Sequence, residues 1–162
     1  MPLDTLLRET LSGLLRELVD GPSGDVAFVV NPGDQGLLGS LARLSAPDAS
    51  ARPGGRSSVA AHVQHLRYGF EILNRWLRGE NPFADASYAA SWGRQQVTDE
   101  EWRDLRNALD REVRAWMSAV TAPREWDAVT LSGAIGSVAH LAYHLGAIRQ
   151  LVASASGPPA AD

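Results

Sequence analysis

The 162 residues suffice for one domain, and the hydrophobic and charged fractions, 44% and 21%, are those of an ordinary globular protein rather than a disordered or fibrous one. The formal net charge is −4, and all fifteen basic residues are arginines scattered along the chain, which argues against a nucleic-acid partner. Because the chain has no cysteine, histidines and carboxylates are the strong metal ligands that it can offer.

The first predicted helix covers residues 3–20, where leucines recur at spacings of three and four residues. Gly21 and Pro22 end this pattern, as glycine and proline commonly do at helix C-termini. Residues 24–55 carry much of the glycine and proline of the chain, so we expect a long connection with one short helix at residues 36–45. The apolar run 26–30 is too short and too isolated to build a sheet.

The second long helix is predicted to begin after Ser57 or Ser58, either of which is a suitable N-cap. Its apolar stripe runs from Val59 to Leu77 and stops before Gly79. Residues 79–96 show no sustained period and are expected to form a second long connection across the domain.

Thr98 and Glu101 form a capping box, which predicts the start of a third helix that ends before Pro123. Thr130 is expected to cap the last helix, which stays apolar as far as Val152. Four long helices with long connections after the first and the second predict an all-α four-helix bundle. We expect a single domain over residues 1–153 and a flexible C-terminal tail over residues 154–162.

All four histidines lie in predicted helices, His62 and His65 in the second and His140 and His144 in the last. Residues four apart project from one helical face, so His140 and His144 can converge on one ion, with a third nitrogen from the second helix. The competing interpretation is a hydrogen-bonded core histidine, and it is the stronger one for His62 taken alone. An unpartnered buried imidazole costs about 1–3 kcal/mol, and metal coordination would offset that cost.

Other residues have weaker claims to a site. Trp92 and Trp126 lie on predicted loops and are candidates for lining a substrate pocket, with packing as the alternative. Arg67, Arg75 and Arg149 are candidates for binding a carboxylate of a thiol cofactor, although a solvated surface position is the more common one for arginine.

Two segments resemble the DinB-like family of bacterial metal-binding four-helix proteins. Residues 58–66, SVAAHVQHL, resemble the family's pattern S-[IV]-x-x-[IL]-x-x-H-L at the start of its second helix. Residues 140–150, HLAYHLGAIRQ, resemble its fourth-helix pattern H-x-x-Y-H-x-G-Q-I-x-Q, with Ala147 in place of the glutamine. The pairs Ser91-Trp92 and Glu101-Trp102 and the segment 81–83 also resemble some members.

The resemblance implies a bundle that is often dimeric and that holds a divalent ion, typically nickel or zinc, through three histidines. Carried over by position, these ligands are His65, His140 and His144. His62 falls where the family usually has an apolar residue, which leaves three roles open: a fourth ligand, a group that hydrogen-bonds a ligand, or an acid/base. We expect metal binding to survive the loss of His62.

Characterised members of this family include transferases and isomerases that use a low-molecular-weight thiol, and others have no known activity. The resemblance therefore implies a metal-dependent thiol S-transferase or isomerase, with a non-enzymatic metal-binding or stress-associated bundle as the alternative. A plain bundle with buried histidines is the third hypothesis. We expect a cytoplasmic homodimer without a membrane or nucleic-acid partner, because the N-terminus lacks signal features and no apolar run is long enough for a membrane span.

Overall fold

The computed structural model describes residues 1–159, and this part of the chain is helical without any strand. The helices are α1 (Leu3–Asp20), α2 (Gly36–Ala42), α3 (Ala46–Ser50), α4 (Val59–Leu77), α5 (Asp99–Thr121) and α6 (Ala128–Leu151). Short 3-10 turns lie at Pro53–Gly55 (η1), Pro82–Ala84 (η2), Ala90–Trp92 (η3) and Ala153–Ala155 (η4). The prediction of an all-α bundle is confirmed.

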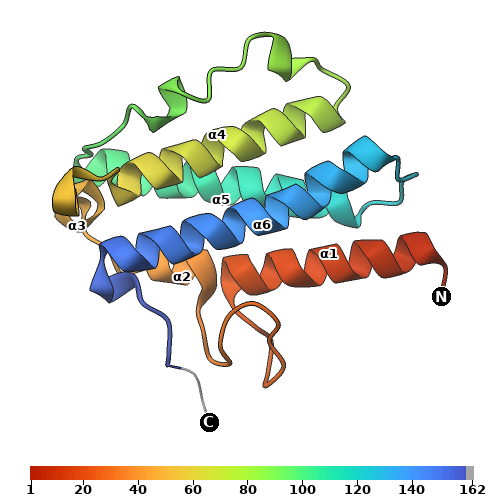
Figure 1. Ribbon diagram of the computed structural model, residues 1–162, viewed down its shortest axis with the longest axis horizontal. Helices are drawn as coiled ribbons and strands as arrows, with labels where there is room; N and C mark the ends of the chain where they lie inside the picture. Colours follow the sequence, from red (N-terminus) through yellow and green to blue (C-terminus); the bar gives the residue numbers. More distant parts are fainter. Residues whose placement is uncertain (160–162) are drawn as a thin grey trace.

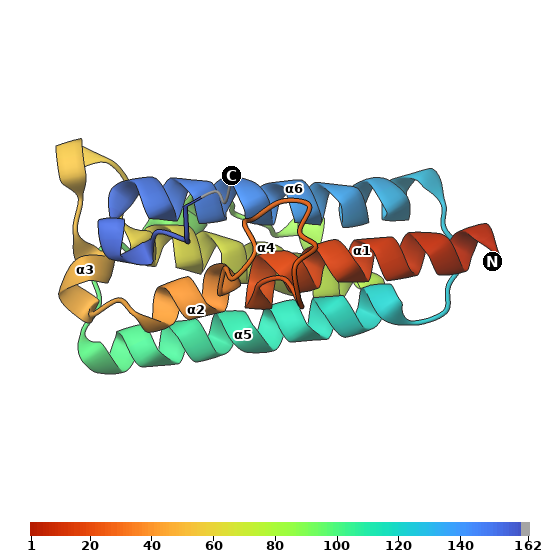
Figure 2. The same cartoon turned by 90° about the horizontal axis from the view of Figure 1, so that it is seen from below.

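The four long helices α1, α4, α5 and α6 lie side by side along the long axis of the molecule (Figures 1 and 2). Both α1 and α4 pack against α5 and α6, so α1 and α4 occupy diagonal corners of the bundle. Their shared core contains fully buried residues from each long helix, including Leu15, Leu66, Leu109 and Leu141. Burying each such side chain contributes about 1.5–3 kcal/mol, which favours this arrangement of apolar stripes.

Two of the three predicted caps are confirmed. The Ser58 side chain accepts a hydrogen bond from the backbone N–H of Ala61, and Thr98 forms the expected capping box with Glu101. The prediction that Thr130 caps the last helix is wrong. The carboxylate of Asp127 accepts the N–H of Thr130 at 2.7 Å, so α6 begins three residues earlier, and Thr130 lies inside its first turn.

The connection 24–55, which was predicted to hold one short helix at residues 36–45, contains two short α-helices. α2 ends at Ala42, and Ser45 then begins α3 through a second capping box, in which its hydroxyl accepts the N–H of Asp48. The Asp48 carboxylate accepts the N–H of Ser45 in return, at 3.0 Å. These paired bonds satisfy free N–H groups and start a helix that the apolar pattern, which ends at Ser45, does not predict.

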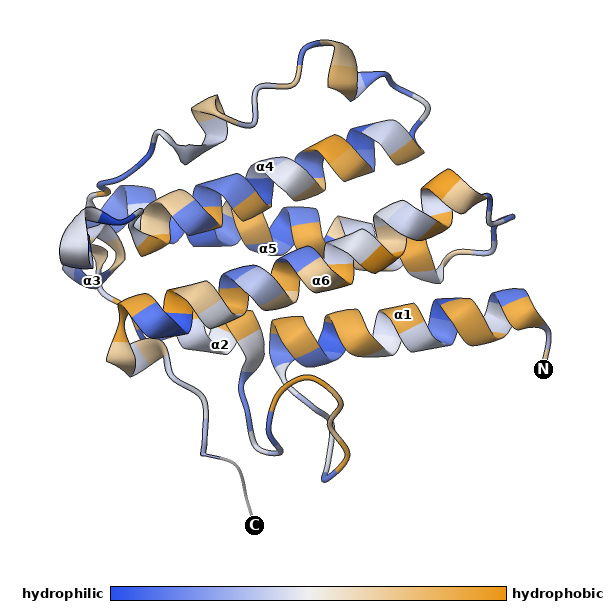
Figure 3. Cartoon of the chain, in the orientation of Figure 1, coloured by the Kyte–Doolittle hydropathy of each residue, from blue (hydrophilic) through white to orange (hydrophobic). Residues whose placement is uncertain are grey.

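The loop between α1 and α2 is held to the domain by a buried carboxylate. Glu17 of α1, which is 6% exposed, accepts the backbone N–H groups of Phe28, Val29 and Val30 at 2.6–2.9 Å. The side chains of Val26 and Phe28 nevertheless remain 70% and 80% exposed, and Figure 3 shows this apolar stretch beside α1. The loop thus presents hydrophobic side chains outward while three of its backbone N–H groups bond to Glu17.

The connection between α4 and α5 arches over the outer side of α4, as the green segment of Figure 1 shows. Its turn η3 packs directly against α4. The predicted flexible segment 154–162 begins with residues that contact the domain: Ala155 is fully buried, and Arg43 donates to the carbonyl groups of Ser154 and Ser156. Residues 160–162 lie outside the described residues. Within residues 1–159, no helix combines the length and the apolar character needed to cross a membrane.

Candidate metal centre

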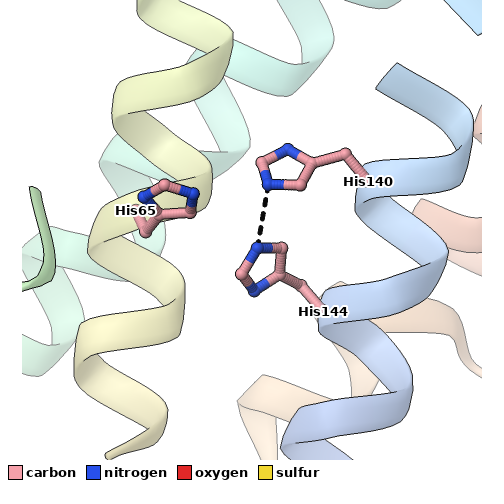
Figure 4. Close-up of side chains that lie close together, drawn as sticks. All are labelled: His65, His140 and His144. Atoms are coloured by element: carbon pink, nitrogen blue, oxygen red, sulfur yellow. Dashed lines mark hydrogen bonds between the residues drawn. The ribbon is translucent and has the colours of Figure 1, made fainter. Parts of the chain in front are cut away.

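Three histidine side chains converge between α4 and α6 (Figure 4). His65 comes from α4, and His140 and His144 lie one turn apart on α6, as their spacing predicts. One ring nitrogen of each lies within 4.8 Å of the others. His65 and His144 are buried, and His140 is partly buried. The tertiary structure therefore brings together the three residues that the family resemblance names as ligands.

The rings of His140 and His144 meet through their Nε2 atoms, which are 2.9 Å apart. Both Nε2 atoms are thus directed into the space that His65 faces from α4 (Figure 4). Helix α6 produces this convergence because its side chains at positions i and i+4 lie one above the other on the same face.

The proton on the His65 ring can be placed from its neighbours. The Ser91 hydroxyl donates to the backbone carbonyl of Tyr88 at 2.6 Å, so its single proton is already used. It must therefore accept the 2.7 Å hydrogen bond that joins it to Nδ1 of His65. His65 consequently carries its proton on Nδ1, which leaves the Nε2 lone pair free.

Ser91 and Tyr88 belong to the connection between α4 and α5, and the sequence predicts a function for neither of them. One sequence signal could have indicated a role for Ser91: the Ser91-Trp92 pair is one of the stretches that resemble the family. Trp92, a candidate for lining a pocket, lies instead against the histidines, with its indole stacked on the ring of His65.

His62 contacts the centre from its other side. Its Nδ1 lies 2.8 Å from Nδ1 of His144, the ring nitrogen of His144 that does not face His140. His62 is 7% exposed, and its ring centroid is 5.0 Å from that of His144. In this arrangement, His62 hydrogen-bonds a candidate ligand and does not join the three converging nitrogens.

The surroundings keep these imidazoles neutral. Burial, followed by repulsion from the neighbouring His140 and His62, lowers the pKa of His65 to about 4. Burial and the same kind of histidine repulsion lower the pKa of His144 to about 3, and burial lowers the pKa of His62 and of His140. Only a neutral imidazole has a lone pair for a metal, so this donor set fits a divalent ion.

A cavity of about 220 Å³ adjoins His140 between α4 and α6. It is lined by Gly69, Phe70, Leu73, Tyr88, Gly133, Gly136, Ser137 and His140. Among residues 1–159, no acidic residue and no arginine lines it, and the Ser137 hydroxyl is already engaged by Trp116 and by the carbonyl of Ala134. The cavity therefore suits an uncharged, largely apolar group.

The remaining candidates from the sequence lie outside this arrangement. The three arginines each pair with a carboxylate of this chain: Arg67 with Glu71 at 2.8 Å, Arg75 with Glu80 at 2.7 Å, and Arg149 with Asp34 at 2.7 Å. Trp126 is partly buried, with the guanidinium of Arg124 over its ring. Neither these arginines nor Trp126 lines the cavity beside His140.

The fold and the centre define a class: helical bundles in which histidines from two helices form a potential metal site. A family model described as the DinB superfamily matches residues 34–148, a span that includes the three converging histidines. The chain belongs to the DinB superfamily. It has no match among curated proteins or solved structures.

Proposed function

We propose that this protein binds a divalent metal ion through Nε2 of His65, His140 and His144. The observation that carries the proposal is the convergence of three imidazole nitrogens within 4.8 Å in surroundings that keep the rings neutral. Nickel and zinc are the proposed ions, because imidazole nitrogen is a preferred ligand of both. Three protein ligands leave a coordination position for an exogenous group.

We further propose that the centre serves a metal-dependent thiol S-transferase or isomerase. An ion with an open position can bind a thiol sulfur and lower the thiol pKa. The chain has no cysteine, so the thiol would be a low-molecular-weight cofactor. His140 lies between the centre and the uncharged cavity, which would hold the apolar part of the thiol or of its electrophile. A non-enzymatic metal-binding or stress-associated protein is the alternative.

Two measurements test this function in sequence. Elemental analysis and calorimetric titration of the purified protein with Zn²⁺ and Ni²⁺ should give about one ion per chain, and a protein that binds neither ion would contradict the metal site. The cobalt-substituted protein is then titrated with low-molecular-weight thiols. A sulfur-to-metal charge-transfer band supports thiol chemistry, whereas its absence with every thiol favours the non-enzymatic alternative.

We propose that the protein is a homodimer. Large hydrophobic side chains are exposed at the start of α1 and on the loop that follows the end of α1: Leu3 is 70%, Val26 70% and Phe28 80% exposed. A cavity of about 550 Å³ lies between α1 and this loop, with Leu14 and Phe28 among its lining residues. Apolar surface of this kind is typical of protein interfaces.

A further inference from the structure

The contact between His62 and His144 is a hydrogen bond between two like atoms. Each Nδ1 is 2.8 Å from the other, so one ring must donate and the other must accept. His144 makes a second contact of the same kind, through Nε2 to Nε2 of His140 at 2.9 Å. The three rings therefore form a chain in which the position of one proton determines the position of the next.

The two directions of this chain differ at the atom that would bind the ion. If His62 donates, Nδ1 of His144 is the acceptor, and a neutral His144 then carries its own proton on Nε2. A protonated Nε2 has no lone pair for a metal. If His144 donates from Nδ1, its Nε2 lone pair is free, and His62 accepts at Nδ1 with its proton on Nε2. In the metal-free chain this lone pair accepts from Nε2 of His140, and an ion that replaces the contact would require His140 to carry its proton on Nδ1.

The surroundings of His62 allow either role, and an ion bound at Nε2 of His144 selects the accepting one. The side chain is 7% exposed, and among residues 1–159 no carboxylate hydrogen-bonds its ring. Its other close neighbour is the indole of Trp92, with ring centroids 5.0 Å apart and planes at 83°. His62 thus packs among neutral groups, in an orientation that directs its Nδ1 to His144.

We propose that His62 is a positioning residue that holds His144 with its proton on Nδ1, which presents Nε2 to the ion. Ser91 holds His65 in the same way, by accepting its Nδ1 proton. Metal-binding histidines generally donate their second nitrogen to a carboxylate, a carbonyl or water. Here an imidazole of the helix that also carries His65 fills this position. The inference rests on the proposed metal site.

The test compares His62→Asn with His62→Ala, using Zn²⁺ affinity measured in competition with a chromophoric chelator. The amide oxygen of asparagine can take the place of Nδ1 as an acceptor, whereas alanine removes the acceptor. We expect Zn²⁺ affinity to fall about 10- to 100-fold in His62→Ala and to change less than about threefold in His62→Asn. Metal binding thus survives the loss of His62 but is weaker.

Two spectroscopic readouts separate positioning from ligation and from general stability. The ligand-field spectrum of the Co²⁺-loaded His62→Asn variant should match that of the wild type, since no ligand is lost. Nitrogen NMR of the Zn²⁺-loaded wild type should show the proton of His144 on Nδ1, and this measurement needs no variant to fold.

Native affinity in His62→Ala would overturn the proposal, and so would equal losses in both variants. A changed Co²⁺ spectrum in His62→Asn would make His62 a ligand instead, and a proton on Nε2 of His144 would exclude the proposed orientation. The first three of these results leave the metal site itself standing, whereas a protonated Nε2 would also remove His144 from the proposed ligand set. A wild-type protein that binds neither Zn²⁺ nor Ni²⁺ would overturn both proposals.

Discussion

The imidazole of His65 and the indole of Trp92 are stacked, with ring centroids 4.3 Å apart and planes inclined by 21°. The same indole lies 5.6 Å from the ring of His144. Trp92 therefore forms a wall of the histidine cluster, contributed by the connection that crosses the outer side of α4. This contact excludes water from the His65 ring and places an intrinsic fluorophore beside the candidate metal site.

Binding of Ni²⁺ or Co²⁺ should quench tryptophan fluorescence, because these ions have absorbing or paramagnetic states that act at short range. Replacement Trp92→Phe should remove most of the metal-dependent quenching while leaving metal affinity within about tenfold of the wild type. Trp126→Phe is the control, since Trp126 lies outside the lining of the neighbouring cavity. Fluorescence titration measures the quenching in each variant. An equal loss of quenching in Trp92→Phe and Trp126→Phe would contradict this placement of the ion.

Loss of either histidine on α6 should abolish tight metal binding. In the wild type, an ion at 100 times its dissociation constant adds about 2.7 kcal/mol to the free energy of unfolding, because it binds only the folded chain. Differential scanning fluorimetry should therefore show a higher Tm with Zn²⁺ than with a chelator. His140→Ala and His144→Ala should lose this difference. Ile135→Ala, a control at an exposed position of the same helix, should keep it.

The metal-free protein should lose stability as the pH falls from 6.5 towards 5. The folded-state pKa values of His65 and His144, about 4 and about 3, lie below the value of about 6.5 in the unfolded chain. The unfolded chain then binds more protons, so the free energy of unfolding falls by at most about 1.4 kcal/mol per pH unit for each histidine, and by less where solvent reaches the ring.

Urea unfolding at pH 7, 6 and 5 measures this dependence. From about one pH unit above 6.5 both states are essentially neutral at these rings, and the contribution is constant. The carboxyl groups with lowered pKa, such as those of Glu101 and Asp127, act at lower pH, so the chosen window isolates the histidines. The variant His144→Asn should show a smaller slope. An unchanged or rising stability between pH 6.5 and 5 would contradict the neutral, buried state of these rings.

Filling the cavity beside His140 should reduce the binding of bulky thiols selectively. A side chain at Gly136 meets no atom within 4 Å of its Cβ, so Gly136→Leu can extend into the cavity without a backbone clash. In the Co²⁺-loaded protein, we expect the preference for benzyl mercaptan over ethanethiol to fall about tenfold or more, which corresponds to the loss of one buried aromatic group.

Gly146→Leu is the matched control for this experiment. Gly146 lies on the same helix with similar open space at its Cβ, but it does not line the cavity. It should leave the thiol preference as in the wild type, and both variants should retain their metal affinity. A preference that survives in Gly136→Leu would place the substrate elsewhere.

Light scattering coupled to gel filtration should give a mass of twice 17.4 kDa at micromolar concentration. The replacement Phe28→Ser removes the most exposed large hydrophobic side chain of the described residues and should shift the protein towards the monomer. Phe83→Ser is the control, because Phe83 is also exposed but lies on the connection after α4. A wild-type mass of 17.4 kDa would exclude the dimer.

The sequence by itself determined the four long helices and the pairing of His140 with His144. Helical spacing is local, so residues four apart must share a face wherever the helix lies in the fold. Capping is also local, although the choice between Asp127 and Thr130 depended on which oxygen reaches a free N–H group. Ser45 shows the same limit, because an apolar repeat does not reveal where one short helix stops and another starts.

Only the tertiary structure decided what surrounds these helices. Ser91 contacts His65 from 26 positions along the chain, and His62 contacts His144 from 82 positions away. His65 approaches α6 from a different helix. No local pattern encodes such contacts, because they depend on how the bundle packs and on the path of the connection between α4 and α5. The direction of each imidazole nitrogen follows from these long-range neighbours, and it is this direction that turns four helical histidines into a candidate metal centre.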